Sequence, residues 1–173
     1  MTGVRPKVYL GIDPGFADAG YGVVAIVGGK EKCIAYGSIQ TSAGDDAALR
    51  LREVSEELGA LLKKFRPDCV AVEKLYFAKN AKTALAVAEA RGVIRMTIAM
   101  HDIPCREFNP ADVKIAVCGH GTAPKKQVQR MVMSLLDLKD LPKPDDAADA
   151  LGLAIALANS EKFSAAVAKS GTK

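Results

Sequence analysis

The sequence lacks the features that direct a protein to a membrane or out of the cell. No uninterrupted apolar run in the 173 residues reaches the roughly 18 residues of a transmembrane helix. Residues 1–7 contain neither the apolar stretch nor the small-residue cleavage site of a signal peptide. The four cysteines form no Cys-x-x-Cys pair, and we interpret them as small buried thiols in a reducing compartment. We therefore expect a cytoplasmic protein.

Histidine is also scarce, which narrows the metal chemistry. The two histidines, His101 and His120, exclude a histidine-rich metal site. The net charge of +4 alone predicts no partner. The length fits one domain, and a hydrophobic content of 49% is enough for a folded core. We place a single domain at residues 1–160 and assign residues 161–173, which are polar and mildly basic, to a frayed C-terminal tail.

The hydrophobic pattern predicts an α/β domain. Three strand-like segments with short links open the chain and favour an antiparallel meander. Helical and strand-like segments then alternate, and helices close the chain, with Asn109 and Thr122 as expected N-caps. The expected strands are 8–12, 21–27, 33–39, 69–72 and 103–108, and the expected helices include 46–65, 80–100 and 110–118, with one after Thr122 and one from Asp145. This order predicts a mixed five-stranded sheet, antiparallel strands followed by parallel ones, with helices on both faces.

Four carboxylates occupy positions typical of a catalytic site. Asp13 and Glu73 end the first strand and the buried fourth strand, where α/β folds place their chemistry. Asp146 and Asp149 lie three residues apart at the start of a helix and share one face. A carboxylate such as Asp149 in an apolar helix is costly unless it is paired, for example with a distant lysine, or metal-bound. Carboxylates without histidine suit Mg²⁺ or Mn²⁺, and such a cluster can hold two ions about 4 Å apart for phosphodiester hydrolysis.

Several motifs together resemble those of the RuvC family of Holliday junction resolvases. The chain opens with Gly11-Ile12-Asp13-Pro14-Gly15, a turn that sugar-kinase and actin-like ATPases share in similar form. The further motifs, in family order, are Gly20-Tyr21-Gly22-Val23, Ala71-Val72-Glu73, Ala78-Lys79-Asn80, Ala90-Arg91-Gly92-Val93, Gly119-His120-Gly121 and Asp146-Ala147-Ala148-Asp149-Ala150-Leu151. The resemblance covers residues 8–158, nearly the whole predicted domain.

The resemblance implies an RNase H-like fold and a homodimeric, Mg²⁺-dependent endodeoxyribonuclease. Such an enzyme resolves four-way DNA junctions by paired symmetric nicks in homologous recombination and DNA repair, and it leaves 5′-phosphate ends. Asp13, Glu73, Asp146 and Asp149 would be the catalytic, metal-binding quartet for two Mg²⁺ ions, with Mn²⁺ as a substitute. Asp13 would bridge both ions, and Asp146 would complete the shell around the water-activating ion. The resemblance also implies the RuvA–RuvB branch-migration complex as a partner.

The resemblance further implies a set of DNA-binding residues. Family members usually carry phenylalanine three residues after the catalytic glutamate. This chain has Tyr76 there, with Phe77 beside it, which leaves open which ring stacks on junction bases. Lys114 and Lys125 match basic residues near the scissile phosphate, and Lys126 extends that patch. The complete set is Tyr76, Phe77, Lys79, Asn80, Lys114, Lys125 and Lys126.

Three other functions are compatible with parts of the sequence. One is a different RNase H-like nuclease that acts on RNA or on other branched nucleic acid. Another is an actin-like ATPase, but that fold needs a second phosphate-binding glycine turn and a longer chain, and the sequence has neither. The third is a junction-binding protein without nuclease activity, and the intact acidic quartet argues against it.

Overall fold

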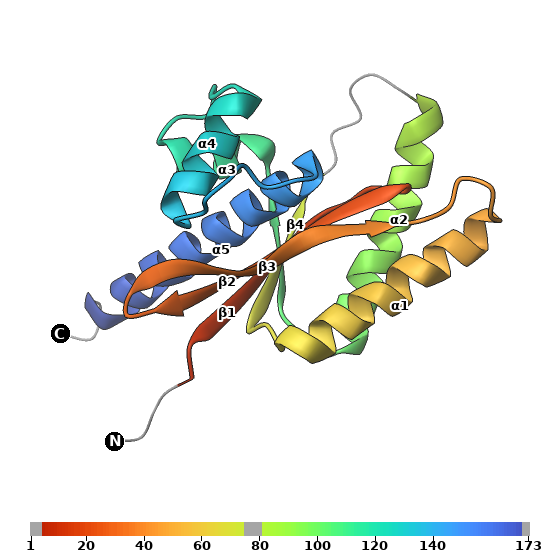
Figure 1. Cartoon of the computed structure of the whole chain (residues 1–173). Coiled ribbons are helices and arrows are strands. Elements are labelled where there is room, and N and C mark those ends of the chain that lie inside the picture. Colours follow the sequence, from red (N-terminus) through yellow and green to blue (C-terminus); the bar gives the residue numbers. More distant parts are fainter. Residues whose placement is uncertain (1–4, 75–80, 171–173) are drawn as a thin grey trace.

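The computed structural model describes residues 5–74 and 81–170, which form a mixed five-stranded sheet between two helical layers (Figure 1). The strand order is β3-β2-β1-β4-β5. The first three strands form the expected antiparallel meander, whereas β4 runs parallel to β1 and β5 runs parallel to β4. The strands are β1 (Lys7–Asp13), β2 (Asp18–Val27), β3 (Lys30–Gln40), β4 (Cys69–Glu73) and β5 (Cys105–Phe108). The predicted fold class is confirmed.

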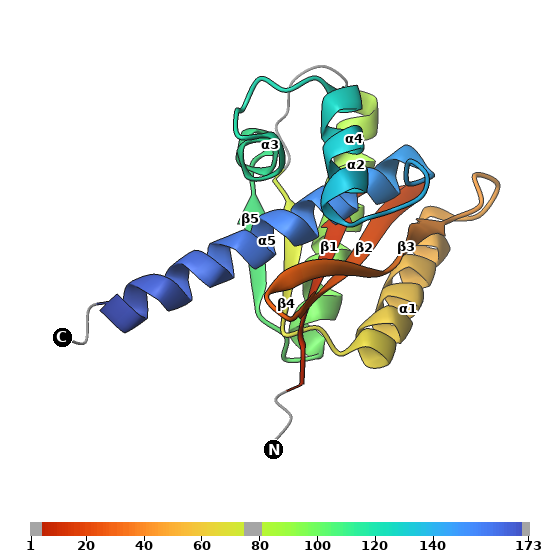
Figure 2. The same ribbon diagram turned by 60° about the vertical axis from the view of Figure 1, so that its left-hand side comes forward.

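Two groups of helices cover the two faces of the sheet. Helices α1 and α2 pack on one face, and α3, α4 and α5 lie on the other (Figures 1 and 2). The alternation of strand side chains produces this arrangement, since Leu10 and Ile12 face α1 and α2 while Tyr9 faces α5. The helices are α1 (Ala47–Phe65), α2 (Ala81–Met100), α3 (Pro110–Cys118), α4 (Lys125–Leu135) and α5 (Asp145–Ser170). None of the helices in these described ranges is long and apolar enough to cross a membrane.

The helix that follows α3 begins later than the sequence predicts. Its first residue is Lys125, and Pro124 occupies the N-cap position in an extended conformation. Thr122 was expected to cap this helix, but its hydroxyl instead lies 3.2 Å from Nδ1 of His120. The prediction for Thr122 is therefore wrong, because the extended backbone at Pro124 sets the start of the helix.

Residues 161–170 continue α5 as regular helix, so the prediction of a frayed end is wrong over this range. Two ion pairs hold the continuation: Arg106 Nη2 lies 2.7 Å from Glu161 Oε1, and Lys162 pairs with Glu31. Alanine and lysine in this segment also have high helix propensity. The division of the chain at residue 160 stays a prediction.

The cysteines are free thiols, as expected, but they are not all buried. Cys69 is buried in the central strand β4, whereas Cys105 is exposed on the edge strand β5. Cys33 and Cys118 are half-buried. The prediction of burial is therefore wrong for Cys105, because β5 has a neighbour on one side only.

Candidate active site

Two of the candidate carboxylates end neighbouring parallel strands. Asp13 is the last residue of β1 and Glu73 is the last residue of β4, with Ile12 opposite Val72 in the ladder between them. The carboxyl ends of both strands therefore meet at one edge of the sheet. Because side chains alternate between the faces, Asp13 and Glu73 both project toward the face that α5 covers.

Helix α5 brings the other two carboxylates to the same edge, and glycine in the strands lets it approach. A Cβ atom at Gly11 would lie 2.7 Å from the backbone nitrogen of Ala154. A Cβ atom at Gly20 would lie 2.9 Å from the Cβ of Asp146. No larger residue fits at either position without a shift of α5. The first turns of α5, with Asp146 and Asp149, are thereby seated against β1 and β2.

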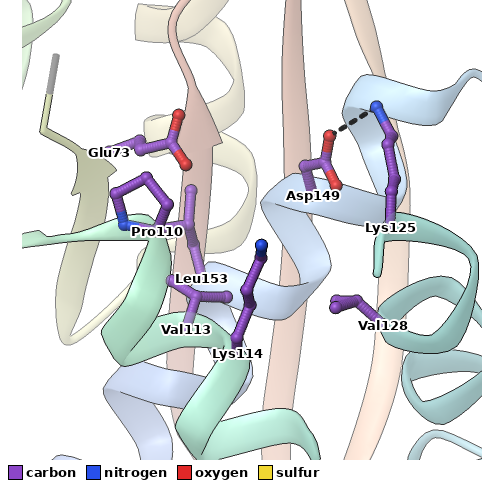
Figure 3. Close-up of a pocket in the computed structure, with 8 residues that line it drawn as sticks. All are labelled: Glu73, Pro110, Val113, Lys114, Lys125, Val128, Asp149 and Leu153. Carbon is purple, nitrogen blue, oxygen red and sulfur yellow. Dashed lines mark ion pairs between the residues drawn. The ribbon is translucent and has the colours of Figure 1, made fainter. Parts of the chain in front are cut away.

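Three carboxylates form a tight cluster, and the fourth faces it across a pocket. One oxygen each from Asp13, Asp146 and Asp149 lie within 4.8 Å of one another. Glu73 is not a member of this cluster, but it lines the same pocket as Asp149, from the opposite side (Figure 3). The pocket has a volume of about 230 Å³. Of the four predicted carboxylates, Asp13, Asp146 and Asp149 thus lie together, and Glu73 lies across the pocket from Asp149.

The crowding of these carboxylates changes their proton affinity. Burial raises the pKa of Asp13 to about 8, and the negative charges of Glu73, Asp149 and Asp146 add to the effect. Burial and neighbouring carboxylates also raise the pKa of Glu73 and the pKa of Asp146. Without a bound cation, Asp13 is therefore mostly protonated at neutral pH.

Lys125 supplies a positive charge beside the cluster. Its Nζ lies 2.9 Å from Oδ2 of Asp149 and 3.6 Å from Oδ2 of Asp145. Burial lowers the pKa of Lys125, but the hydrogen bond and the charge of Asp149 outweigh it, and the net pKa is raised. The ammonium group of Lys125 cannot by itself balance the three clustered carboxylates and Glu73, so the site favours additional positive charge.

The donor set fits a divalent metal ion with hard oxygen ligands. The cluster consists of aspartate oxygens and includes no histidine or cysteine within the described ranges, a composition that suits Mg²⁺ or Mn²⁺ better than Zn²⁺. Half-buried carboxylates this close repel one another unless a cation or a proton lies between them. Glu73 offers a further carboxylate oxygen across the pocket from Asp149.

Of the predicted DNA-binding residues, the structure describes the three lysines Lys114, Lys125 and Lys126. Lys114 and Lys125 line the pocket beside the acidic residues (Figure 3). Lys126 follows on the first turn of α4 and is exposed. The remaining residues, Tyr76, Phe77, Lys79 and Asn80, lie outside the residues that the structure describes.

Two arginines that sequence reasoning gave no role hold the backbone beside the site. Arg91 Nε donates a hydrogen bond to the carbonyl oxygen of Glu73 at 3.2 Å. Arg50 is buried, lies 4.0 Å from the centre of the Phe16 ring and donates from Nε to Thr41 Oγ1 at 3.0 Å. These contacts secure the end of β4 and the turn after β1. In the sequence, Arg91 lies within the Ala90–Val93 motif, whereas no motif includes Arg50. Both arginines are distant in sequence from the carboxylates, so no local spacing connects them with the site.

Comparisons with known proteins agree with this architecture. The family model "Crossover junction endodeoxyribonuclease RuvC" matches residues 9–157. A protein of that name from Syntrophomonas wolfei is 49% identical over 164 residues, which are 95% of each chain. The solved structure of Thermus thermophilus RuvC superposes with a TM-score of 0.85 at 34% identity, over 91% of this chain and 96% of that one. T. thermophilus RuvC in complex with a Holliday junction substrate gives a TM-score of 0.82 at 31% identity, with the same coverage.

Proposed function

Because this chain belongs to the RuvC family, we propose that it is a crossover junction endodeoxyribonuclease that resolves four-way DNA junctions. It cuts two strands by paired symmetric nicks and acts in homologous recombination and DNA repair. One observation carries the proposal: the chain matches its relatives over nearly its whole length. The cluster of Asp13, Asp146 and Asp149, with Glu73 across the pocket from Asp149, supports it. A member that had become a binding-only protein would have no need of these carboxylates.

Asp13, Glu73, Asp146 and Asp149 are the proposed catalytic residues and the proposed ligands of two Mg²⁺ ions, for which Mn²⁺ substitutes. Bound at a phosphodiester, such ions supply a hydroxide nucleophile at neutral pH and stabilise the charge of the leaving oxygen. Asp13 would be the ligand shared by the two ions, and the charges around it are consistent with that role. The charges of the three other carboxylates all act on Asp13, whereas Asp149 is the carboxylate that acts on Glu73.

The chain itself contributes orientation and charge around the carboxylates. Val113 and Val128 are buried apolar residues in the wall of the pocket, and they limit the access of water to the acidic groups. Lys114 and Lys125 face the same space and bind the DNA near the scissile phosphate. With its four site carboxylates neutralised, the net charge of the chain changes from +4 to +8, which favours binding to a phosphate backbone.

The set of DNA contacts extends beyond the pocket. Lys126 is exposed next to Lys125 and contacts the backbone of the junction. Tyr76, Phe77, Lys79 and Asn80 lie between three and seven residues after Glu73 in the sequence, and we assign them to the junction bases and phosphates. One aromatic ring of this segment stacks on a base.

The family also provides the proposed assembly and setting. A homodimer supplies two sites, one for each nicked strand. The RuvA–RuvB branch-migration complex is the proposed partner that delivers the junction, and the cytoplasm is the proposed compartment.

A cleavage assay on a synthetic mobile four-way junction tests the function. With Mg²⁺, the wild type should make paired nicks that DNA ligase can reseal, and it should leave linear duplex and RNA–DNA hybrid uncut. Asp149→Asn should bind the junction as tightly as the wild type and cut it at least about 100-fold more slowly. Asp145→Asn is the matched control. The side chain of Asp145 is 69% exposed, compared with 30% for Asp149, and Asp145 lies outside the acidic cluster.

Three results would contradict the proposal. If the wild type binds the junction but makes no nicks in Mg²⁺ or Mn²⁺, the chain is a junction-binding protein without nuclease activity. Cleavage of the hybrid alone would indicate an RNA-directed nuclease. Wild-type cleavage by Asp149→Asn would show that the site is elsewhere.

A further inference from the structure

The end of strand β4 is held by a contact from outside the sheet. The β1–β4 ladder ends at Ile12 and Val72, so the carbonyl group of Glu73 lies beyond it. Arg91, on α2, donates to that carbonyl oxygen from Nε at 3.2 Å. On the other side, the backbone N–H of Lys74 donates to the carbonyl oxygen of Phe108 at 2.9 Å. The backbone of the last β4 residue is thus fixed on both sides.

Glu107 holds Arg91 in place. Nη2 of Arg91 lies 2.6 Å from Oε1 of Glu107, and the Arg91 side chain is only 18% exposed. Glu107 is opposite Val72 in the β4–β5 ladder and is therefore part of the same sheet edge. A planar guanidinium can bind a carbonyl and a carboxylate through two different N–H groups in a fixed geometry. Arg91 thereby ties α2, β4 and β5 together at Glu73.

We propose that Arg91 is a positioning residue that sets the Glu73 carboxylate across the pocket from Asp149. Glu73 depends on such support because it lies outside the cluster of Asp13, Asp146 and Asp149 and stands at the very end of β4. A small rotation of the β4 end would move its carboxylate away from the other three. The inference rests on the proposed function only in assigning metal binding to Glu73.

Arg91→Gln tests this role with three measurements. Single-turnover cleavage of the four-way junction should slow by roughly 10- to 100-fold, the usual loss when a residue that supports a metal ligand is replaced. Binding of Mn²⁺ to the DNA-free protein, measured by calorimetry, should weaken. Amide hydrogen exchange at Glu73 and Lys74 in the metal-free protein should accelerate. Junction binding without divalent ions should stay at the wild-type level.

Arg95→Gln is the matched control. Arg95 lies one turn further along α2 and pairs with the same carboxylate, at 3.2 Å from Glu107 Oε1, but 54% of its side chain is exposed. Its replacement should leave cleavage, Mn²⁺ binding and exchange at the end of β4 unchanged. Arg91→Lys keeps the charge without the planar fork, and we expect it to recover part of the activity. If Arg91→Gln does not fold, Arg91→Lys and Glu107→Gln carry the same test with smaller effects.

The outcomes separate this inference from the proposed function. Folded Arg91→Gln with wild-type Mn²⁺ affinity and wild-type exchange would overturn the role of Arg91. So would an equal loss of Mn²⁺ affinity in Arg95→Gln. A wild-type protein that leaves junctions uncut would instead overturn the proposed function, and Mn²⁺ binding and exchange would still decide whether Arg91 positions Glu73.

Discussion

At the scale of single residues, Asp13 is where the charges of the site accumulate. It is half-buried at the end of β1, and the other three carboxylates all disfavour its ionised form. The protein therefore has two ways to stabilise this residue, a proton or a cation. The choice between them depends on pH and on the supply of divalent ions.

This competition predicts how Asp13 affects stability in the absence of metal. The pKa of Asp13 rises from an ordinary value of 3.8 to about 8 on folding. Between these values the folded protein binds more protons than the unfolded protein, so the free energy of unfolding falls as pH rises. Asp13→Asn removes the charge, and we expect it to be more stable than the wild type at pH 8 by about 1–3 kcal/mol, with a smaller difference at pH 5. Urea unfolding of both proteins in EDTA at pH 5 and pH 8 measures their free energies of unfolding. A difference between variant and wild type that is the same at both pH values would contradict the prediction.

Lys125 gives a second prediction at this scale. Its ammonium group pairs with the carboxylate of Asp149, which is a proposed metal ligand. Lys125→Met should therefore tighten Mn²⁺ binding to the DNA-free protein and still slow junction cleavage by roughly 10- to 100-fold, because a phosphate contact is lost. Lys126→Met is the control for Mn²⁺ binding alone, since Lys126 is exposed and does not line the pocket. Calorimetry and single-turnover cleavage measure the two effects, and weaker Mn²⁺ binding by Lys125→Met would count against the competition.

At the scale of elements, helix α5 assembles the site. It carries two of the four carboxylates, Asp146 and Asp149. It also packs along β1 and β2, and β1 carries a third carboxylate, Asp13. Gly11 and Gly20 set the distance between this helix and the sheet. The geometry of the acidic cluster is therefore determined by backbone packing as well as by the acidic residues themselves.

Replacement of one of these glycines should damage stability and activity together. A Cβ atom at Gly11 would lie 2.7 Å from the Ala154 nitrogen and would push α5 outward. We expect Gly11→Ala to cost about 1–3 kcal/mol of stability and to slow cleavage even where the variant is fully folded. Gly92→Ala on α2 is the control, because a Cβ atom there meets nothing within 4 Å. Thermal unfolding and cleavage below the transition test this; a stable, fully active Gly11→Ala would contradict it.

The sequence predicts those parts of this site that depend on local pattern. The strand ends at Asp13 and Glu73 and the helical spacing of Asp146 and Asp149 follow from hydrophobic periodicity. The separation of Glu73 from the other three carboxylates does not, because it depends on how three elements pack. The contact of Arg91 with the Glu73 carbonyl bridges 18 positions in the chain, and no local pattern specifies such a pair.

At the scale of the whole molecule, α5 connects two distant regions. Its first turns lie at the acidic pocket, and its C-terminal half extends away from the sheet (Figure 2). Arg106 on β5 and Glu31 on β3 hold this extension by ion pairs with Glu161 and Lys162. Through these two pairs the extension is tied to both edge strands of the sheet, β5 and β3.

Removal of residues 161–173 should therefore affect stability and leave catalysis intact. The truncated chain loses both ion pairs, each worth about 0–1 kcal/mol, so we expect Tm to fall by about 2–5 °C. The cleavage rate per folded molecule should not change. In the full-length chain, combined Glu31→Gln and Arg106→Gln should reproduce most of the fall in Tm. Loss of cleavage on truncation would show that the extension has a role at the site.

The length of α5 also offers a convenient point of attachment. Its 26 residues form one continuous helix, and at 1.5 Å per residue it is about 39 Å long. A fluorophore or a surface anchor placed on its last turn stands at the far end from the pocket. The enzyme can then be immobilised by this turn while junctions diffuse freely to the carboxylates, so that individual cutting events can be timed on single molecules.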